Sequence, residues 1–135
     1  MFERSRSVQH PQLGELTRSR RAWRGSVTLT DGPSIRLSII GERSEPDPEA
    51  VALAANIAAE FGAQRQRIEA VLREHAADLG IHPTELPAPS YAAVIAIDGT
   101  PVIEFGYYVA WDDDHTLGVT LRDGEVELNG SVLEP

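Results

Sequence analysis

Cysteine is absent from the 135-residue sequence, which excludes disulfides, thiolate metal sites and cysteine nucleophiles. Long hydrophobic runs are absent too, because the longest strongly apolar stretch, residues 91–97, is far too short to span a bilayer. Residues 1–24 contain arginines but no apolar run, so they do not resemble a signal peptide. We therefore expect a cytoplasmic protein that contacts no membrane, and no motif predicts a cofactor.

Positive charge is scarce outside the N-terminus, and all twelve cations are arginine. Residues 1–24 carry six arginines and two acids, a net charge of +4, whereas residues 25–135 carry six arginines and nineteen acids, a net charge of −13; the total is −9. A body this acidic repels the phosphates of nucleic acid and attracts a basic protein. Alternatively, the negative charge only keeps the protein soluble and has no partner. We expect a protein partner and no nucleic acid.

Three Asp-Gly pairs, at residues 31–32, 98–99 and 123–124, lie between runs in which apolar and polar residues alternate. Asp-Gly in this setting is a strong signal for a β-hairpin, because glycine tolerates the positive φ that such turns need. The alternating runs are residues 23–30, 35–39, 93–97, 102–111, 117–121 and 126–132. They predict six strands, mostly antiparallel, and the run that is apolar on both faces, 102–111, is expected at the centre of the sheet.

A single helical pattern lies between the second and third of these runs. Asp47-Pro48-Glu49 is typical of a helix start, with aspartate as the N-cap and proline at the first helical position. Apolar residues then recur at spacings of four and seven as far as Leu79, and Gly80 suits the position just after a helix. Gly62, in the middle, favours a kink or a close contact there. The predicted fold is α+β, with about six strands in the order ββ-α-ββββ packed on one long helix.

The N-terminal residues lack any such pattern. Residues 1–12 contain His10-Pro11 and polar side chains without periodicity, which predicts a flexible N-terminal arm. Residues 13–135 have the length of one ordinary domain and contain no internal repeat. We therefore predict a single α+β domain preceded by an arm.

The last third of the chain carries a distinctive motif, AWDDDHTLGV at residues 110–119, followed by Arg122-Asp123-Gly124 and Gly130-Ser131. It is similar to the Trp-Asp-acid-acid-His-Thr-Leu-Gly signature of a family of small bacterial domains of unknown function. Residues 13–16 and 23–25 also resemble the start of these domains. Some members are proposed immunity proteins of polymorphic toxins and others have no proposed role, so a toxin is one partner that the resemblance suggests, and the acidic body suggests a basic one. The family has no established catalytic residues, so the resemblance implies no catalytic role here.

The same motif holds the densest group of polar side chains that could bind a ligand. On the preceding strand, Tyr108 shares a face with Glu104, and an exposed aromatic residue flanked by acids is a suitable anchor for a basic partner. Alternatively, the acidic run is a structural hairpin turn, or it holds a metal ion or a catalytic base. The spacing lacks the Asp-x-Asp-x-Asp-Gly pattern of a calcium loop, which favours the turn and the binding surface over metal or catalysis. The candidate binding residues are Glu104, Tyr108, Asp112, Asp113, Asp114 and His115.

The other histidines and aromatic residues have simpler interpretations. His75 lies near the inner edge of the helical pattern and is expected to be a core or boundary histidine with its hydrogen bonds satisfied. His10 and His82 each directly precede a proline in an expected loop, and both are expected to be solvated. Tyr107 and Trp111 share the inner face of their strand and are expected to pack in the core.

Motifs of known enzymes are missing: there is no Gly-x-Ser-x-Gly elbow and no glycine-rich phosphate loop. The leading hypothesis is a non-enzymatic protein-binding domain of the immunity type, which covers a basic partner with its acidic strand face. One alternative is a structural or accessory homodimer that pairs an edge strand or the far side of its sheet. Another is a small metal-dependent enzyme that uses residues 112–115.

Overall fold

The computed structural model describes residues 6–30 and 32–135, and its strands form one eight-stranded sheet. The strands are β1 (Ser7–His10), β2 (Gly14–Ser19), β3 (Ala22–Thr28), β4 (Ser34–Ile39), β5 (Tyr91–Ile97), β6 (Thr100–Val109), β7 (Asp112–Arg122) and β8 (Glu125–Asn129). They follow one another across the sheet in chain order, and every pair is antiparallel except the parallel pair β4–β5. The predicted α+β class with a mostly antiparallel sheet is confirmed.

The predicted strand count and order are wrong, because β1 and β2 precede the first predicted strand. Val8 and Leu16 are the only apolar residues of these two strands, and they lie opposite each other in the β1–β2 register. One apolar residue in each strand leaves no alternation to detect. Residues 7–10, assigned to a flexible arm, therefore pair with β2, while residues 1–5 of that arm lie outside the described residues.

His10, which was expected to be solvated, is partly buried and closes the β1–β2 turn. Its Nδ1 accepts hydrogen bonds from the backbone N–H groups of Gln12 (3.1 Å) and Leu13 (3.2 Å). These bonds satisfy turn amides that would otherwise depend on water.

Two of the three predicted Asp-Gly turns are confirmed. Asp98 and Gly99 have φ values of 52° and 78°, and Asp123 and Gly124 have 51° and 76°. Positive φ at both central residues is the geometry of the two-residue hairpin turn that matches the twist of its strands. Asp31 of the third pair lies outside the described residues.

Two helices take the place of the one predicted: α1 (Pro48–Ala55) and α2 (Ile57–Asp78). The predicted cap is present, because the Asp47 carboxylate accepts from the Ala50 N–H at 3.0 Å. Asn56 interrupts the helix with φ −102° and ψ 3°; its side-chain amide donates to the Ala52 carbonyl, and its backbone N–H bonds to Leu53. A short amide side chain competes with the helical ladder in this way, so the interruption lies at Asn56 and not at the predicted Gly62.

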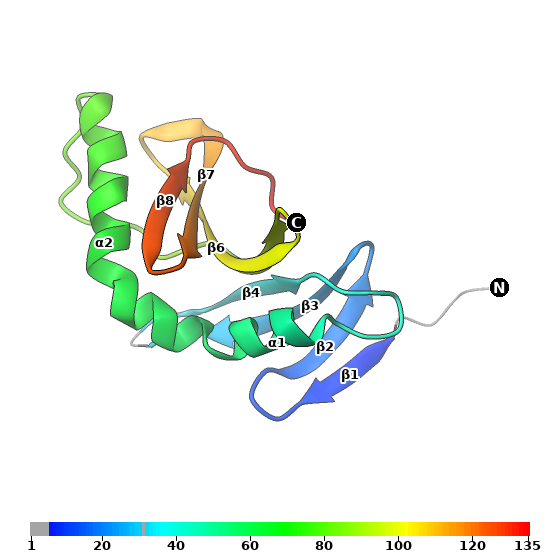
Figure 1. Ribbon diagram of the computed structural model, residues 1–135. Coiled ribbons are helices and arrows are strands. Elements are labelled where there is room, and N and C mark those ends of the chain that lie inside the picture. Colours follow the sequence, from blue (N-terminus) through cyan, green and yellow to red (C-terminus); the bar gives the residue numbers. More distant parts are fainter. Residues whose placement is uncertain (1–5, 31) are drawn as a thin grey trace.

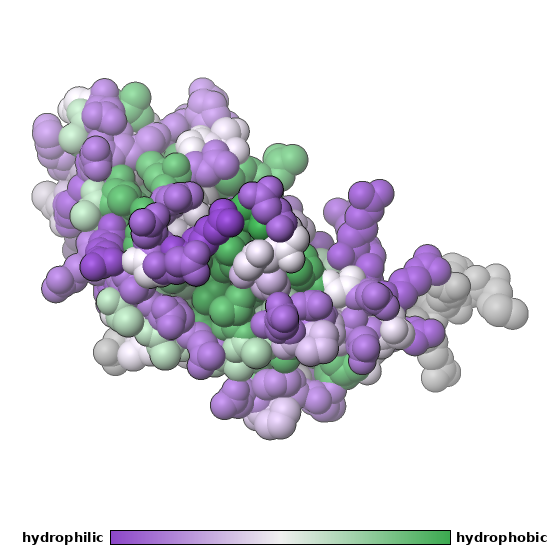
Figure 2. Space-filling view, viewed as in Figure 1, coloured by the Kyte–Doolittle hydropathy of each residue, from purple (hydrophilic) through white to green (hydrophobic). Residues whose placement is uncertain are grey.

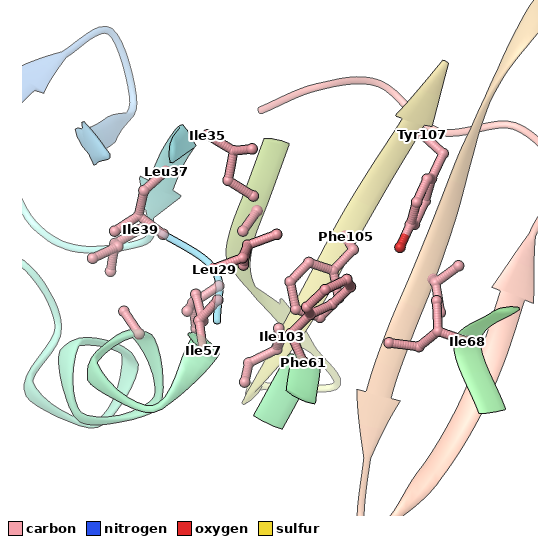
Figure 3. Packing of buried hydrophobic residues seen from close by; sticks show 14 of the residues in the cluster. Leu29, Ile35, Leu37, Ile39, Ile57, Phe61, Ile68, Ile103, Phe105 and Tyr107 are labelled. Atoms are coloured by element: carbon pink, nitrogen blue, oxygen red, sulfur yellow. The ribbon is translucent and has the colours of Figure 1, made fainter. Parts of the chain in front are cut away.

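Both helices pack on one face of the sheet, which is strongly twisted, and Figure 1 shows α1 and α2 running in different directions across it. Residues 102–107 of β6 are all buried, which confirms the prediction of a central strand buried on both faces. The core between the layers joins α2 to β6 through the rings of Phe61 and Phe105, whose centroids are 5.2 Å apart (Figure 3). The helices thus anchor the middle of the sheet and leave its far face to other segments.

Hydrophobic side chains on the face shown in Figure 2 gather near the middle of the molecule, and hydrophilic side chains surround them. Neither helix of the described residues combines the length and apolarity needed to cross a membrane.

Candidate functional site

The β6–β7 hairpin positions the candidate site through an irregular pairing. Its turn is Ala110–Trp111 and β7 begins at Asp112, so the interpretation of residues 112–115 as the turn itself is wrong. Tyr107 pairs with Leu117 and Val109 pairs with Asp112, so residues 113–116 of β7 lie opposite Tyr108 alone. A bulge of this kind bends the strand away from its partner and redirects its side chains. The chain therefore presents consecutive polar residues to solvent around one tyrosine.

Five of the six predicted binding residues line one hollow of about 440 Å³ in this bulge. We call the following set the acidic hollow: Tyr108, Asp112, Asp113, Asp114 and His115. The sequence predicted that these side chains belong together, and the bulge is the reason that they do. Without it, alternation along a strand would send neighbouring acids to opposite faces.

Tyr108 is the aromatic residue of the acidic hollow and is 51% exposed. Its hydroxyl donates to the Glu134 carboxylate at 2.9 Å, and the same carboxylate accepts from Arg36 Nε (2.9 Å) and Nη2 (2.7 Å). Partial burial and then the hydrogen bond to Glu134 raise the pKa of the Tyr108 phenol, so it stays protonated at neutral pH. The C-terminal segment thereby fixes the direction of an exposed ring.

Asp112 links the hollow to helix α2. Its Oδ1 is 2.7 Å from His115 Nδ1, and its Oδ2 is 3.7 Å from His75 Nε2. The Trp111 indole donates from Nε1 to His75 Nδ1 at 3.0 Å. Because Nδ1 of His75 accepts this bond, the proton of neutral His75 lies on Nε2, on the side of Asp112. The hydrogen bond to Asp112, and then its charge, raise the pKa of His115.

The expectation for His75 is confirmed, since the ring is partly buried and bonded at the boundary of the core. Trp111 is only partly buried: its ring packs against the edge of the core and its N–H reaches the helix. This contact could not be predicted from the sequence, because it joins residues 36 positions apart.

Glu104, the sixth predicted residue, does not belong to the hollow. It lies on the same face of β6 as Tyr108, but it is only 5% exposed and accepts from the Tyr91 hydroxyl at 3.1 Å. A Cβ atom at Gly118 would lie 2.7 Å from Val132 and 3.2 Å from the Glu104 carboxylate, so the C-terminal segment packs close to this carboxylate. Burial raises the pKa of Glu104, and the hydrogen bond from Tyr91 opposes that shift.

An apolar groove of about 600 Å³ adjoins the acidic hollow and shares Tyr108 and Ala110 with it. Its remaining walls are Trp111 and the proline-rich segment 81–90. We define the apolar groove by Ile81, Pro83, Leu86, Pro87, Tyr108 and Trp111. Ile81 is 38% exposed, and Leu79, which directly follows the last residue of helix α2, is another exposed apolar side chain. Sequence reasoning missed this groove, although isolated apolar residues between prolines were a signal for it.

Within residues 6–30 and 32–135, no group of three or more histidine, aspartate and glutamate side chains is arranged to hold a metal ion. No family model, curated protein or solved structure matches this chain. The chemistry of the acidic hollow and the apolar groove is therefore the basis for a function.

Proposed function

We propose that this chain is a non-enzymatic protein-binding domain that binds a basic protein, as an immunity-type protein binds its toxin. The observation that carries the proposal is the continuity of the acidic hollow with the apolar groove through Tyr108. Protein interfaces have an apolar, aromatic centre and a polar rim, and a few central aromatic residues supply most of the binding energy.

The charge of the hollow favours a cationic partner. Asp113 and Asp114 are exposed, and neither takes part in an ion pair within the described part of the chain. Exposed acids of this kind accelerate the encounter with a basic surface, and the effect weakens as salt screens it. Arginine or lysine side chains would meet Asp113 and Asp114 while an apolar side chain enters the groove.

The test measures binding of a basic protein encoded beside this gene by isothermal titration calorimetry at low and high salt. We expect a nanomolar dissociation constant that rises with salt. Tyr108→Ala should weaken binding by about tenfold or more, as expected of an aromatic hot spot. Asp113→Asn combined with Asp114→Asn should weaken binding several-fold at low salt and less at high salt.

A matched control removes the same charge elsewhere. Glu125 and Glu127 are exposed on β8, outside both the hollow and the groove. The double variant Glu125→Gln, Glu127→Gln should bind with nearly unchanged affinity. Failure of the neighbouring proteins to bind, or equal losses in both double variants, would contradict the proposal.

The homodimer alternative stays a prediction. One of the two edge strands is β8, whose exposed residues are Glu125, Glu127 and Asn129. Two copies of this edge in antiparallel pairing would place acids near acids, which disfavours the contact. Light scattering after size exclusion distinguishes the alternatives, since the proposed function needs only a monomer.

A further inference from the structure

A second concave site lies on the helix side of the sheet, away from the acidic hollow. This cavity has a volume of about 170 Å³ and lies between α2, the loop after β3, residues 86–88 and the side chain of Tyr107. Exposed residues, among them Thr30, Pro33 and Ala88, form its rim, and its inner walls are buried residues of the core. Apolar cavities of roughly 150 Å³ are large enough to bind benzene.

The walls of the cavity are mostly apolar. Phe61, Ile68 and Leu72 of α2 form one side, and Leu86 forms the opposite side. Phe61, Ile68 and Leu72 are buried and belong to the core, so they hold a preformed surface. Such a surface gains free energy when it meets the apolar body of a ligand instead of water.

Tyr107 supplies a polar group to this apolar space. Its side chain is 1% exposed, and no hydrogen bond joins its hydroxyl to another described residue. Figure 3 shows its oxygen directed toward the side on which Ile68 of α2 lies. Burial raises the pKa of the Tyr107 phenol, so it is a neutral donor and acceptor at physiological pH. A hydroxyl or carbonyl group of a ligand in the cavity would find this donor and acceptor between the apolar walls.

The remaining polar groups at the cavity favour a neutral ligand. Arg65 Nε and Glu69 Oε1 are 3.2 Å apart and largely compensate each other's charge. The hydroxyl of Thr30 already donates to the Ala58 carbonyl at 3.3 Å. Neither an anion nor a cation therefore finds a free counter-charge among the described lining residues.

Residues 86–88 at the rim of the cavity belong to segment 81–90, which forms neither helix nor strand. Leu86 of this segment is only partly buried, and it lines both the cavity and the apolar groove. A segment without ladder hydrogen bonds opens at lower cost than a strand does.

We propose that this cavity binds a small neutral molecule, with one compact apolar ring or alkyl group and one hydroxyl or carbonyl group. The apolar body lies among Phe61, Ile68, Leu72 and Leu86, and the polar group bonds to the Tyr107 hydroxyl. This site shares Leu86 and Pro87 with the apolar groove, but its polar group is the Tyr107 hydroxyl and not Tyr108, so either proposal stands if the other fails.

The test titrates the ¹⁵N-labelled full chain with phenol and, separately, with benzene, and follows the backbone amide shifts by NMR. We expect saturable, millimolar binding of both probes, with shifts concentrated at α2 and Tyr107. Nuclear Overhauser effects should connect phenol protons to the methyl groups of Ile68 and Leu72. Tyr107→Phe should weaken phenol binding by about fivefold, the worth of one net hydrogen bond, and leave benzene binding unchanged.

Two further variants keep the test decisive. Tyr108→Phe removes the neighbouring hydroxyl, which bonds to Glu134 on the other face, and should bind both probes like the parent chain. Leu86→Phe enlarges a partly exposed wall residue and should abolish binding of both probes by filling the space. Absence of saturable shifts, or equal phenol affinity in the parent chain and in a folded Tyr107→Phe variant, would overturn the proposal. Unaltered binding in Leu86→Phe would overturn it as well.

Discussion

Gly106 lies directly beneath the ring of Tyr91, on the face of the sheet opposite the helices. A Cβ atom at this position would stand 1.8 Å from Tyr91 Cε1, inside any permitted contact distance. The glycine therefore lets the ring lie flat on β6, and from there the Tyr91 hydroxyl reaches Glu104. The absence of a side chain at Gly106 therefore makes room for the Tyr91 ring, whose hydroxyl donates to the buried Glu104 carboxyl group.

Gly106→Ala should lower the free energy of unfolding by about 3 kcal/mol, because the ring of Tyr91 must leave its place. Urea denaturation followed by circular dichroism measures the loss. Gly130→Ala is the control, since its Cβ would meet no described atom within 4 Å, and it should change stability little. Equal stability of the two variants would show that Tyr91 does not pack on Gly106.

Glu104 should make stability fall as the pH rises. Burial raises its folded-state pKa above the ordinary value of 4.5, so the folded chain keeps this proton after the unfolded chain has lost it. Below about pH 4 both states are protonated and the group has no effect. As the pH rises past 4.5, the unfolded state ionises first and the free energy of unfolding decreases until the folded carboxyl group ionises too.

Glu104→Gln removes this titration and keeps an oxygen that accepts from Tyr91. Its free energy of unfolding should equal that of the parent chain at low pH and exceed it at neutral pH, measured by urea denaturation across the range. Glu127→Gln, which changes an exposed acid on β8, should retain the parent slope. A Glu104→Gln variant whose pH dependence matches the parent would mean that Glu104 titrates normally.

At the scale of elements, helix α1 depends on its first residues more than on its length. It spans only 8 residues, and helices this short are marginal without help at their ends. Asp47→Ala removes the bond to the Ala50 N–H and should cost about 1 kcal/mol of stability. Asp47→Asn keeps a capping oxygen and should be nearly neutral, as thermal unfolding of both variants would show. Similar losses in both would point to the charge instead of the cap.

Elements specified by local chemistry were predictable from the sequence. The Asp98-Gly99 and Asp123-Gly124 turns and the start of α1 each need only two or three adjacent residues to form. The β1–β2 hairpin was not predictable, since Leu16 is its only fully buried residue and Val8 is only partly buried. The break at Asn56 was missed because its neighbours continue the helical pattern on both sides.

The candidate site follows the same division. Tyr108 and residues 112–115 are close in sequence, so their grouping was predictable, whereas the bulge that turns them outward was not. The Trp111–His75 bond and the apolar groove depend on how helix α2 and the segment after it lie against the β6–β7 hairpin. Glu104 was assigned to the site on the alternation of β6, which cannot reveal that Tyr91 and Val132 enclose its carboxyl group.

At the scale of the whole molecule, the sheet consists of two meanders joined along one seam. Strands β1–β4 and strands β5–β8 are each connected by short hairpin turns, and the parallel pair β4–β5 joins the two groups. Figure 1 shows the helices between β4 and β5 in the chain crossing from one group to the other. The C-terminal segment adds a second link, because Glu134 pairs with Arg36 and the Pro135 carbonyl accepts from Arg24.

Separate fragments 1–82 and 88–135 should reassemble when mixed. Each keeps its own meander, and the break falls in the segment that forms neither helix nor strand. A one-to-one complex by light scattering, with the circular dichroism of the intact chain, is the expected result. Ile39→Asp, in the strand that meets β5, should prevent reassembly, whereas Glu15→Gln at the distant β1–β2 hairpin should not. Fragments that stay apart would mean that the seam needs the covalent crossover.

The parallel seam also sets how quickly the chain reaches its native state. Hairpins close over a few residues, but β4 can meet β5 only after the 51 residues between Ile39 and Tyr91 have been brought back on themselves. Contacts of such sequence separation slow folding, and the strand edges that await them are open to other chains meanwhile. The two meanders should therefore form early and their union should limit the refolding rate, which makes the exposed edge of β4 the place where newly made copies of this protein are most at risk of aggregation.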